Sequence, residues 1–120
     1  MPKYAKTIKA LSLFSNVGIS ETYLDEIGVD VVVANELLEE RANFYRHLYP
    51  RTDMICGDIT NPDVFEKVKD RAKEENVNMI IATPPCQGMS CAGSKNPDDP
   101  RNFLIYYAIE MIKEVQPDLI

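Results

Sequence analysis

A cysteine follows two prolines in the segment 83–90, and its type and position suit it to covalent chemistry. Pro84 and Pro85 each fix a backbone dihedral angle, so they stiffen the chain and set the direction of Cys86. An apolar, strand-like run precedes the prolines, which places Cys86 at the end of a predicted buried strand. A cysteine held at the rim of a ligand crevice can act as a nucleophile. The alternative is a structural cysteine that fills space at a strand end.

Three other segments carry residues that could bind a nucleoside. A strand-like run passes into a turn at Gly18, where free N–H groups at a helix start can approach a ligand. Glu36 lies 18 positions further on, about where nucleoside-binding α/β domains use an acidic residue to hold ribose hydroxyls. Asp58 and Ile59 follow a third strand, where a carboxylate could accept a hydrogen bond from an adenine amino group while the isoleucine packs on the ring.

Each of these three segments also has a purely structural explanation. The turn at Gly18 lacks the full glycine pattern of dinucleotide-binding domains and could be a plain turn between strand and helix. Glu36 could be a solvated residue in the first turn of a helix, where its charge suits the helix dipole. Asp58 could begin a loop or assist the next helix cap. Gly18 and Glu36 taken together favour the ribose role.

Short apolar runs alternate with longer amphipathic ones along the chain. This pattern predicts strands over 8–14, 29–34, 53–56 and 77–82, with a fifth strand just beginning at 118–120. Helices are predicted over 20–27, closed by Gly28, over 36–48, from Asn61 and Pro62 onward, and over 102–115. Strands that alternate with helices predict βαβ units, and hence an α/β fold with a mostly parallel sheet and flanking helices.

The carboxyl ends of parallel strands are where such sheets bind ligands. Four segments are expected to meet at that rim: 14–19, 35–36, 57–59 and the chain from 83 onward. Residues 83–100 read as a long loop, and long loops in compact domains are usually functional or disordered. We therefore expect one site that joins the predicted nucleoside-binding residues to Cys86.

Composition limits the remaining classes of function. A chain of 120 residues suggests one domain, and no run approaches the roughly 18 apolar residues of a membrane span. The chain leads straight into a strand-like run without a signal-peptide core, so we expect a cytoplasmic location. Three cysteines without a CxxC pair, and one histidine, argue against a metal site. A net charge of −6 with no cluster of Lys and Arg argues against a broad nucleic-acid-binding face.

The order of these short segments resembles the N-terminal motifs of the DNA (cytosine-5) methyltransferases. The matching segments are Leu-Phe-Ser-Asn-Val-Gly (13–18), Asn-Glu (35–36), Gly-Asp-Ile (57–59), Pro-Pro-Cys-Gln (84–87) and Asp-Pro-Arg-Asn (99–102). The resemblance covers 8–120, and Pro-Cys-Gln is its most specific part. It implies a Rossmann-like methyltransferase fold, truncated at the start of the fifth strand, with S-adenosylmethionine as cofactor. It also implies methyl transfer to C5 of cytosine in DNA through a covalent bond between the cysteine and C6, in a bacterial restriction-modification system.

The resemblance also assigns roles to single residues. Three would be catalytic: Cys86 as the nucleophile, Gln87 in the mobile loop that closes over DNA, and Arg101 after that loop. Ser90 would also belong to the loop. Nine would bind the cofactor: Phe14, Ser15, Gly18, Ile19, Glu36, Leu37, Asp58, Ile59 and Pro85.

Within the cofactor set, Phe14 would stack on the adenine and Leu37 would cover it. Glu36 would bind the ribose hydroxyls, and Asp58 with Ile59 would read the adenine edge. The chain departs from the family where Asn16 and Ile19 stand in place of two glycines. That departure concerns the methionine end of the cofactor pocket and not its adenine end.

The family's Glu-Asn-Val motif, its later strands and its target-recognition region are not present in residues 1–120. We therefore expect an N-terminal cofactor-binding and catalytic-loop part that is inactive alone and grips double-stranded DNA through regions it lacks. It could be a fragment, or one half of a split enzyme with a complementary C-terminal half as partner. Alternatives are a tRNA cytosine-5 methyltransferase and a cofactor-binding fragment without catalysis. An amino-nitrogen methyltransferase fits less well, because Thr83 and Cys86 replace its polar and aromatic residues.

Overall fold

The computed structural model describes residues 8–84 and 104–120. In this part of the chain, four parallel strands form one sheet in the order β3-β2-β1-β4. The strands are β1 (Ile8–Leu13), β2 (Val29–Glu36), β3 (Asp53–Cys56) and β4 (Met79–Ala82). This is the order of the first half of a doubly wound Rossmann-type sheet, whose direction of growth reverses between β1 and β4. The predicted α/β fold with a parallel sheet is confirmed.

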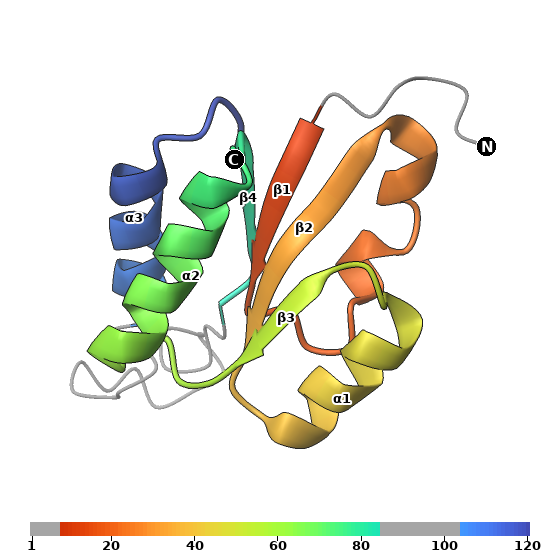
Figure 1. Ribbon diagram of the computed structural model, residues 1–120, viewed down its shortest axis with the longest axis horizontal. Coiled ribbons are helices and arrows are strands. Elements are labelled where there is room, and N and C mark those ends of the chain that lie inside the picture. Colours follow the sequence, from red (N-terminus) through yellow and green to blue (C-terminus); the bar gives the residue numbers. More distant parts are fainter. Residues whose placement is uncertain (1–7, 85–103) are drawn as a thin grey trace, which may run out of the picture.

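Helices cover both faces of the sheet (Figure 1). Helices α2 (Pro62–Glu74) and α3 (Leu104–Val115) lie on one side. Helix α1 (Glu39–Leu48) and two short 3-10 segments, η1 (Ile19–Glu21) and η2 (Leu24–Ile27), lie on the other. None of the described helices is long and apolar enough to cross a membrane.

The central strands are buried on both faces, as the β-branched run at the start of β2 predicts. Alternate side chains of a strand point to opposite faces of the sheet, so β1 and β2 each contribute to an apolar cluster on both faces. Leu11, Leu13 and Val33 pack under α2 and α3, whereas Ala10 and Val31 pack on the side of the 3-10 segments. The sheet is therefore a rigid layer that fixes the positions of its strand ends.

The predicted helix over 20–27 is wrong, because the chain forms the two 3-10 segments instead. Backbone bonds in both segments span three residues, as in the bond from the Thr22 N–H to the Ile19 carbonyl at 3.2 Å. The Thr22 hydroxyl donates to the same carbonyl at 2.8 Å and so competes with the α-helical ladder. A segment this short gains little from helix propagation, so local competition decides its form. Gly28 ends the segment as predicted, with φ of 85°.

The other element boundaries follow the predictions closely. Helix α1 begins at Glu39 rather than at 36, because β2 continues through Glu36. The side chain of Asn61 caps α2 by accepting the N–H of Asp63 at 2.9 Å, and Pro62 stands in the first turn as predicted. Strand β4 starts two residues later than predicted, at Met79. The predicted fifth strand is seen as one parallel bridge between Leu119 and Met79.

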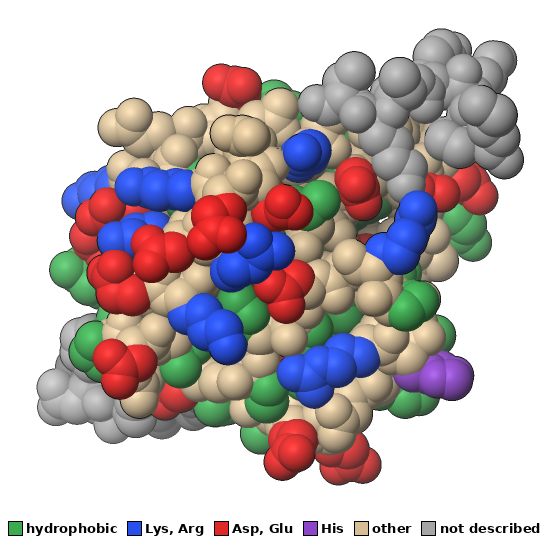
Figure 2. Space-filling model, in the orientation of Figure 1, with side chains coloured by type: hydrophobic (Ala, Val, Ile, Leu, Met, Phe, Trp, Pro, Cys, Tyr) green, Lys and Arg blue, Asp and Glu red, His purple; other side chains and the backbone are tan. Residues whose placement is uncertain are grey.

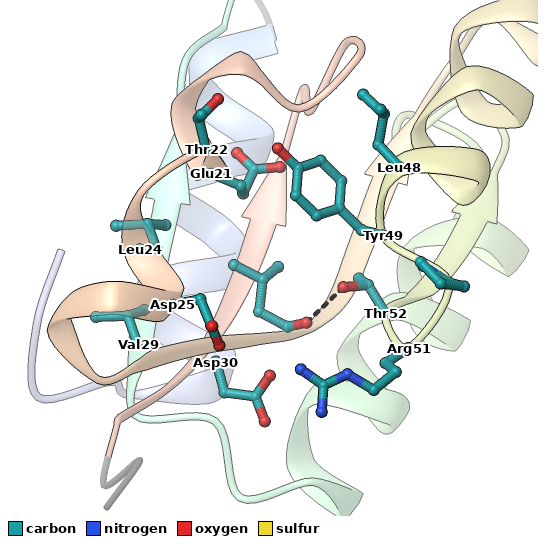
Figure 3. A pocket seen from close by; sticks show the side chains of 12 residues that line it. Glu21, Thr22, Leu24, Asp25, Val29, Asp30, Leu48, Tyr49, Arg51 and Thr52 are labelled. Carbon is teal, nitrogen blue, oxygen red and sulfur yellow. Dashed lines mark hydrogen bonds between the residues drawn. The ribbon is translucent and has the colours of Figure 1, made fainter. Parts of the chain in front are cut away.

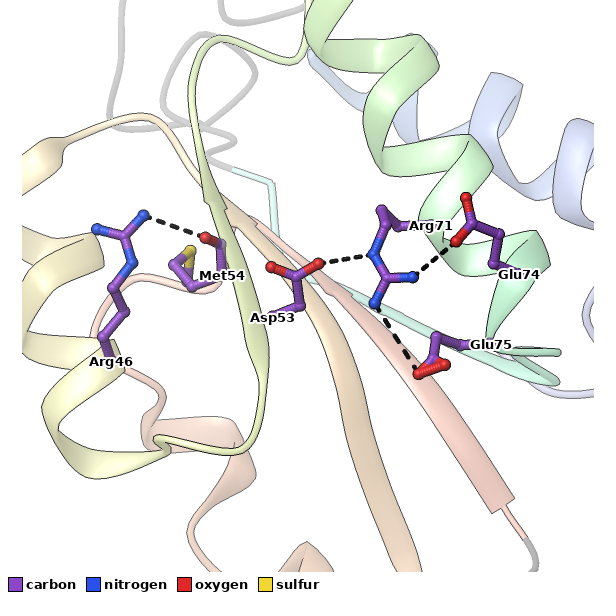
Figure 4. A network of polar contacts seen from close by, with 6 residues as sticks. All are labelled: Arg46, Asp53, Met54, Arg71, Glu74 and Glu75. Atoms are coloured by element: carbon purple, nitrogen blue, oxygen red, sulfur yellow. Dashed lines mark hydrogen bonds and ion pairs between the residues drawn. The ribbon is translucent and has the colours of Figure 1, made fainter.

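An ion-pair network holds α2 against the start of β3 (Figure 4). Nε of Arg71 donates to Asp53 Oδ2 at 2.7 Å, and its Nη1 donates to Glu74 Oε2 at 3.0 Å. On the other side of β3, Arg46 of α1 donates to the Met54 carbonyl at 3.1 Å. These contacts are partly exposed, so we expect each to add little stability. They position β3 between α1 and α2.

Candidate functional site

A cavity of about 350 Å³ lies at the carboxyl ends of the strands. It opens at the point where the strand order reverses, the position at which doubly wound sheets bind ligands. Residues from the ends of all four strands and the starts of α1 and α3 line it: Phe14, Asn16, Asn35, Glu36, Leu37, Leu38, Arg41, Gly57, Asp58, Ile59, Thr83 and Leu104. The four rim segments that the sequence predicts do meet here.

Glu36 is the buried acid of this cavity, with 6% of its surface exposed. Its Oε1 accepts the N–H of Asn16 at 2.9 Å, and its Oε2 accepts the N–H of Leu38 at 2.8 Å. These two bonds fix the carboxylate between the turn after β1 and the start of α1. A carboxylate offers about four lone-pair positions. Two acceptor positions therefore remain for hydroxyl donors inside the cavity.

Asn35 and Ser15 brace the strand ends behind the cavity. The Asn35 side chain donates to the carbonyls of Ile55 at 2.8 Å and Gly57 at 3.1 Å, which ties β2 to the end of β3. The Asn35 carbonyl accepts the N–H of Ser15 at 3.1 Å and its hydroxyl at 3.2 Å, which ties β2 to β1. Ser15 is buried by these contacts and does not line the cavity. Its position suits a supporting role.

Apolar side chains form part of the cavity wall. Leu37 is 58% exposed and Leu38 is 46% exposed, although both follow a buried strand. Ile59 and Phe14 pack against the main core and still reach the cavity. Exposed apolar residues beside a polar pocket are typical of a site that takes a partly apolar ligand. A flat ring system is a ligand of that kind.

Asp58 both lines the cavity and begins the loop after β3, the two positions that the sequence suggested for it. It lines the cavity, and its Oδ1 accepts the N–H and the hydroxyl of Thr60 at 2.9 and 2.8 Å. The carboxylate therefore organises the turn after β3 while it faces the cavity. The cap of α2 is Asn61, so Asp58 is not the capping residue.

Gly18 is required by sterics and does not line the cavity. Its φ is 85°, and a Cβ atom there would stand 2.4 Å from Cε2 of Tyr49. The Tyr49 hydroxyl donates to the Gly18 carbonyl at 2.7 Å, which holds the turn onto α1. Ile19 is 76% exposed and also lies outside the lining. Asn16 adopts a left-handed φ of 54°, which asparagine tolerates better than most residues, so it can stand where the family has a glycine.

The predicted catalytic residues lie outside the described residues. These are Cys86, Gln87 and Arg101, together with Ser90 of the predicted loop and Pro85 of the predicted cofactor set. Thr83, at the edge of the described part, lines the cavity, and its hydroxyl donates to the Phe14 carbonyl at 3.4 Å. Within residues 8–84 and 104–120, no three His, Cys, Asp or Glu side chains gather closely enough to hold a metal ion.

Leu38, Arg41 and Leu104 line the cavity but were not predicted as site residues. Leu38 and Arg41 are three positions apart, one turn at the start of α1. The predicted helix began at 36, so Leu38 and Arg41 were placed in its interior and not at its start beside the cavity. Leu104 belongs to a helix whose apolar pattern indicates packing only, so nothing in the sequence pointed to the cavity.

Comparisons with known proteins agree on one family. The model of the family described as C-5 cytosine-specific DNA methylase matches residues 8–120. The Type II methyltransferase M1.HgaI of Avibacterium volantium is 48% identical over 118 residues, which are 93% of this chain and 33% of that protein. The tRNA (cytosine(38)-C(5))-methyltransferase of Spodoptera frugiperda is 27% identical over 110 residues, or 89% of this chain and 32% of that protein.

A crystal structure shows the same arrangement of strands and helices. It is that of an Escherichia coli prophage protein described as a DNA modification methyltransferase, with a TM-score of 0.73 and 27% identity. The match covers 92% of this chain and 30% of the other. The chain thus spans about a third of the length of the proteins it matches.

Proposed function

Because the chain belongs to the C-5 cytosine-specific DNA methylase family, we propose that the cavity at the strand ends binds S-adenosylmethionine. We propose further that the chain takes part in methyl transfer to C5 of cytosine in DNA, in a restriction-modification system. The observation that carries the first proposal is the meeting of Phe14, Glu36, Leu37, Asp58 and Ile59 at one cavity. Relatives named as Type II methyltransferases support the second.

The residues of the cavity fit the parts of this cofactor. Glu36 has acceptor positions left over from its two backbone bonds, which suits the two hydroxyls of a ribose. Leu37 and Phe14 supply apolar surface for the faces of an adenine ring, and Asp58 faces the same cavity as an acceptor for its amino group. S-adenosylmethionine would supply an electrophilic methyl group on its sulfonium sulfur. The roles of Ser15, Gly18, Ile19 and Pro85 toward it stay predictions.

Cys86 is the proposed nucleophile. Consecutive Cα atoms are about 3.8 Å apart, so three peptide links keep the Cα of Cys86 within about 11 Å of that of Thr83. Its thiolate would add to C6 of cytosine, which makes C5 electron-rich enough to take a methyl group. Loss of the C5 proton and release of the thiolate then restore the aromatic ring. The target base must leave the stacked duplex before a thiolate can reach C6.

A thiolate must form near neutral pH for this chemistry, whereas the pKa of a free cysteine is about 8.5. A nearby cation or a helix N-terminus can lower the pKa of a thiol. Arg101 follows the predicted loop and is our candidate for that cation. Gln87, next to Cys86, would belong to the loop that closes over the DNA.

An RNA substrate is the second candidate. It is favoured by the similarity to a protein named as a tRNA cytosine-5 methyltransferase. The cofactor site and the cysteine chemistry would be the same in both cases. Assaying methyl transfer to tRNA and to duplex DNA in parallel would separate the two substrates.

The proposed cofactor site can be tested by calorimetric titration of the chain with S-adenosylhomocysteine. We expect Glu36→Ala to weaken binding by about 10- to 100-fold, since hydrogen bonds to a charged group contribute about 1.5–3 kcal/mol. Glu39→Ala is the matched control, because Glu39 is an exposed acid three residues away and outside the cavity. We expect this control to bind as the unchanged chain does.

The Glu36 carboxylate also accepts two backbone N–H groups, so Glu36→Ala could lose binding by disturbing the fold. A second variant therefore tests the site at another residue. Asp58→Asn keeps the side-chain shape but replaces one acceptor oxygen with a donor. It should weaken binding less than Glu36→Ala does. Equal binding by all four proteins, each shown to be folded by circular dichroism, would rule out this cavity as the cofactor site.

A further inference from the structure

Asn35 is a buried residue of the cavity at the carboxyl ends of the strands, and its side chain bonds to neighbouring backbone. Only 3% of its surface is exposed, and it lines the cavity near the end of β2. Its amide nitrogen donates to the carbonyl of Ile55 at 2.8 Å and to that of Gly57 at 3.1 Å. A side-chain amide has two N–H donors, so both are used. The two carbonyls belong to β3 and to the first residue after it.

Gly57 is held by β2 through both of its backbone groups. Its N–H donates to the Glu36 carbonyl at 3.0 Å, and its carbonyl accepts the Asn35 amide. Glycine has no Cβ and is the least restricted residue, so contacts from outside must select its conformation. A peptide group is planar, so the direction of the Gly57 carbonyl sets the plane of the link to Asp58. Asn35 therefore helps to fix the backbone that carries the Asp58 side chain.

Asp58 lines the cavity from the turn that follows this link. Its Oδ1 accepts the N–H and the hydroxyl of Thr60 at 2.9 and 2.8 Å. The second carboxylate oxygen has acceptor positions for a ligand. A charged acceptor attracts an amino group and repels a carbonyl oxygen at the same place. Adenine carries an amino group at C6, whereas hypoxanthine carries an oxygen there, so the place of this carboxylate decides between the two purines.

We propose that Asn35 is a positioning residue for adenine, acting through Gly57 and Asp58. The inference rests on the proposed cofactor site and adds the residue that gives this site its preference for a 6-amino purine. Binding sites need their contacts held to within about 0.5 Å by supporting hydrogen bonds. Loss of the Asn35 amide should therefore weaken the contact of Asp58 with the amino group more than the contacts of Glu36 with the ribose.

The test compares S-adenosylhomocysteine with S-inosylhomocysteine, in which hypoxanthine replaces adenine. Calorimetric titration of the unchanged chain should show a preference for S-adenosylhomocysteine of about 10- to 100-fold, the range for a hydrogen bond to a charged group. Asn35→Ala should lower this preference by about 3- to 10-fold, as expected when one such bond is weakened. A general loss of stability would weaken the binding of both ligands by the same factor and leave the preference as it was.

Thr52→Val is the matched control. The Thr52 hydroxyl donates to the Val31 carbonyl at 2.7 Å, so it also ties the chain at β3 to β2 through a side chain. Figure 3 shows this bond beside a second cavity, of about 330 Å³, at the amino ends of the two strands. That cavity shares no lining residue with the proposed cofactor site. Valine keeps the side-chain shape without the donor, so we expect Thr52→Val to keep the preference of the unchanged chain.

Combining Asn35→Ala with Asp58→Asn tests whether the two residues act together. Asp58→Asn removes the charged acceptor, so adding Asn35→Ala should change the preference no further. Asn35→Ser offers one donor for two carbonyls and should also lower the preference, so it serves if circular dichroism shows that the alanine variant does not fold. An unaltered preference in a folded Asn35 variant, or an equal change with and without Asp58→Asn, would overturn the inference. Binding of neither ligand by the unchanged chain would instead remove the proposed cofactor site itself.

Discussion

At the scale of single residues, two buried glutamates show how one residue type serves different ends. Glu36 is 6% exposed and both of its oxygens accept a backbone N–H. Glu21 is 4% exposed and accepts no backbone N–H, and its neighbours are the hydroxyls of Tyr45 and Ser12. The cost of burying the first carboxylate is offset inside the chain, so the charge can be held ready for a ligand. The cost of burying the second is offset only in part by these hydroxyls, so burial raises the pKa of Glu21 and favours its neutral form.

The raised pKa of Glu21 should make the free energy of unfolding depend on pH. Burial raises its pKa in the folded state above the ordinary value of 4.5. The contribution of Glu21 to the free energy of unfolding is therefore complete below its pKa in the unfolded state, and it is lost as the pH rises through its pKa in the folded state. We expect Glu21→Gln to gain stability relative to the unchanged chain as pH rises above about 4.5. Urea unfolding from pH 4 to pH 8 measures this, and parallel curves for both proteins would contradict it.

Gly18 should be intolerant of any side chain. Gly18→Ala combines a left-handed φ of 85° with a Cβ only 2.4 Å from Tyr49. We expect a loss of about 2–5 kcal/mol, from about 1–2 for the backbone conformation and about 1–3 for overpacking. Gly28 also has φ of 85°, so Gly28→Ala serves as the control for the backbone cost. Equal losses in the two variants, measured by urea unfolding, would show that the tyrosine contact adds nothing.

The sequence predicted those site residues whose position follows from strand ends. Glu36, Asp58 and Ile59 each come directly at or after a strand, so the parallel sheet alone brings them to one edge. Ile19 was also predicted from a segment that follows a strand, yet it is exposed outside the cavity, because it lies beyond the turn at Gly18. Leu104 was missed since its place depends on how α3 packs. Long-range packing of this kind leaves no local signal.

At the scale of elements, the buried strands were the most predictable. The run Val29–Ala34 is β-branched and apolar, and 53–56 was predicted with the bounds of β3. The segment 20–27 was mispredicted because its apolar residues suit a helix, while Thr22 and the left-handed Gly18 favour tight three-residue turns. Helix α1 starts late because pairing with β3 extends β2 through Glu36. Tertiary hydrogen bonds therefore moved the boundaries that local pattern had set.

The cap of α2 should contribute measurably to stability. The Asn61 side chain accepts the N–H of Asp63 at 2.9 Å, and Pro62 has no N–H of its own to satisfy in the first turn. Asn61→Ala should cost about 1 kcal/mol. Asn61→Asp keeps an acceptor and adds a negative charge at the helix start, so it should cost little. Urea unfolding of both variants checks this, and the idea fails if alanine and aspartate are equally destabilising.

At the scale of the whole molecule, the charge bears differently on the proposed cofactor binding and on the proposed DNA binding. The chain has 13 Lys and Arg against 19 Asp and Glu. On the face seen in Figure 2, basic side chains are interleaved with acidic ones and form no broad basic patch. Neutralising a phosphate backbone needs clustered cations, whereas the proposed cofactor contacts need only the strand ends. The two proposed activities therefore need not depend on the same residues.

We therefore predict that the 120-residue chain binds S-adenosylhomocysteine but forms no covalent adduct with duplex DNA that contains 5-fluorocytosine. That base lacks the C5 proton whose loss releases the enzyme, so an active thiolate would stay bound to C6. The chain spans about a third of its relatives, and its net charge of −6 works against DNA binding without help. Denaturing electrophoresis with labelled DNA detects the adduct, and fluorescence anisotropy at several salt concentrations measures binding. An adduct formed by this chain and abolished by Cys86→Ser would contradict the prediction, and it would place the DNA contacts and the catalytic cysteine together within these 120 residues.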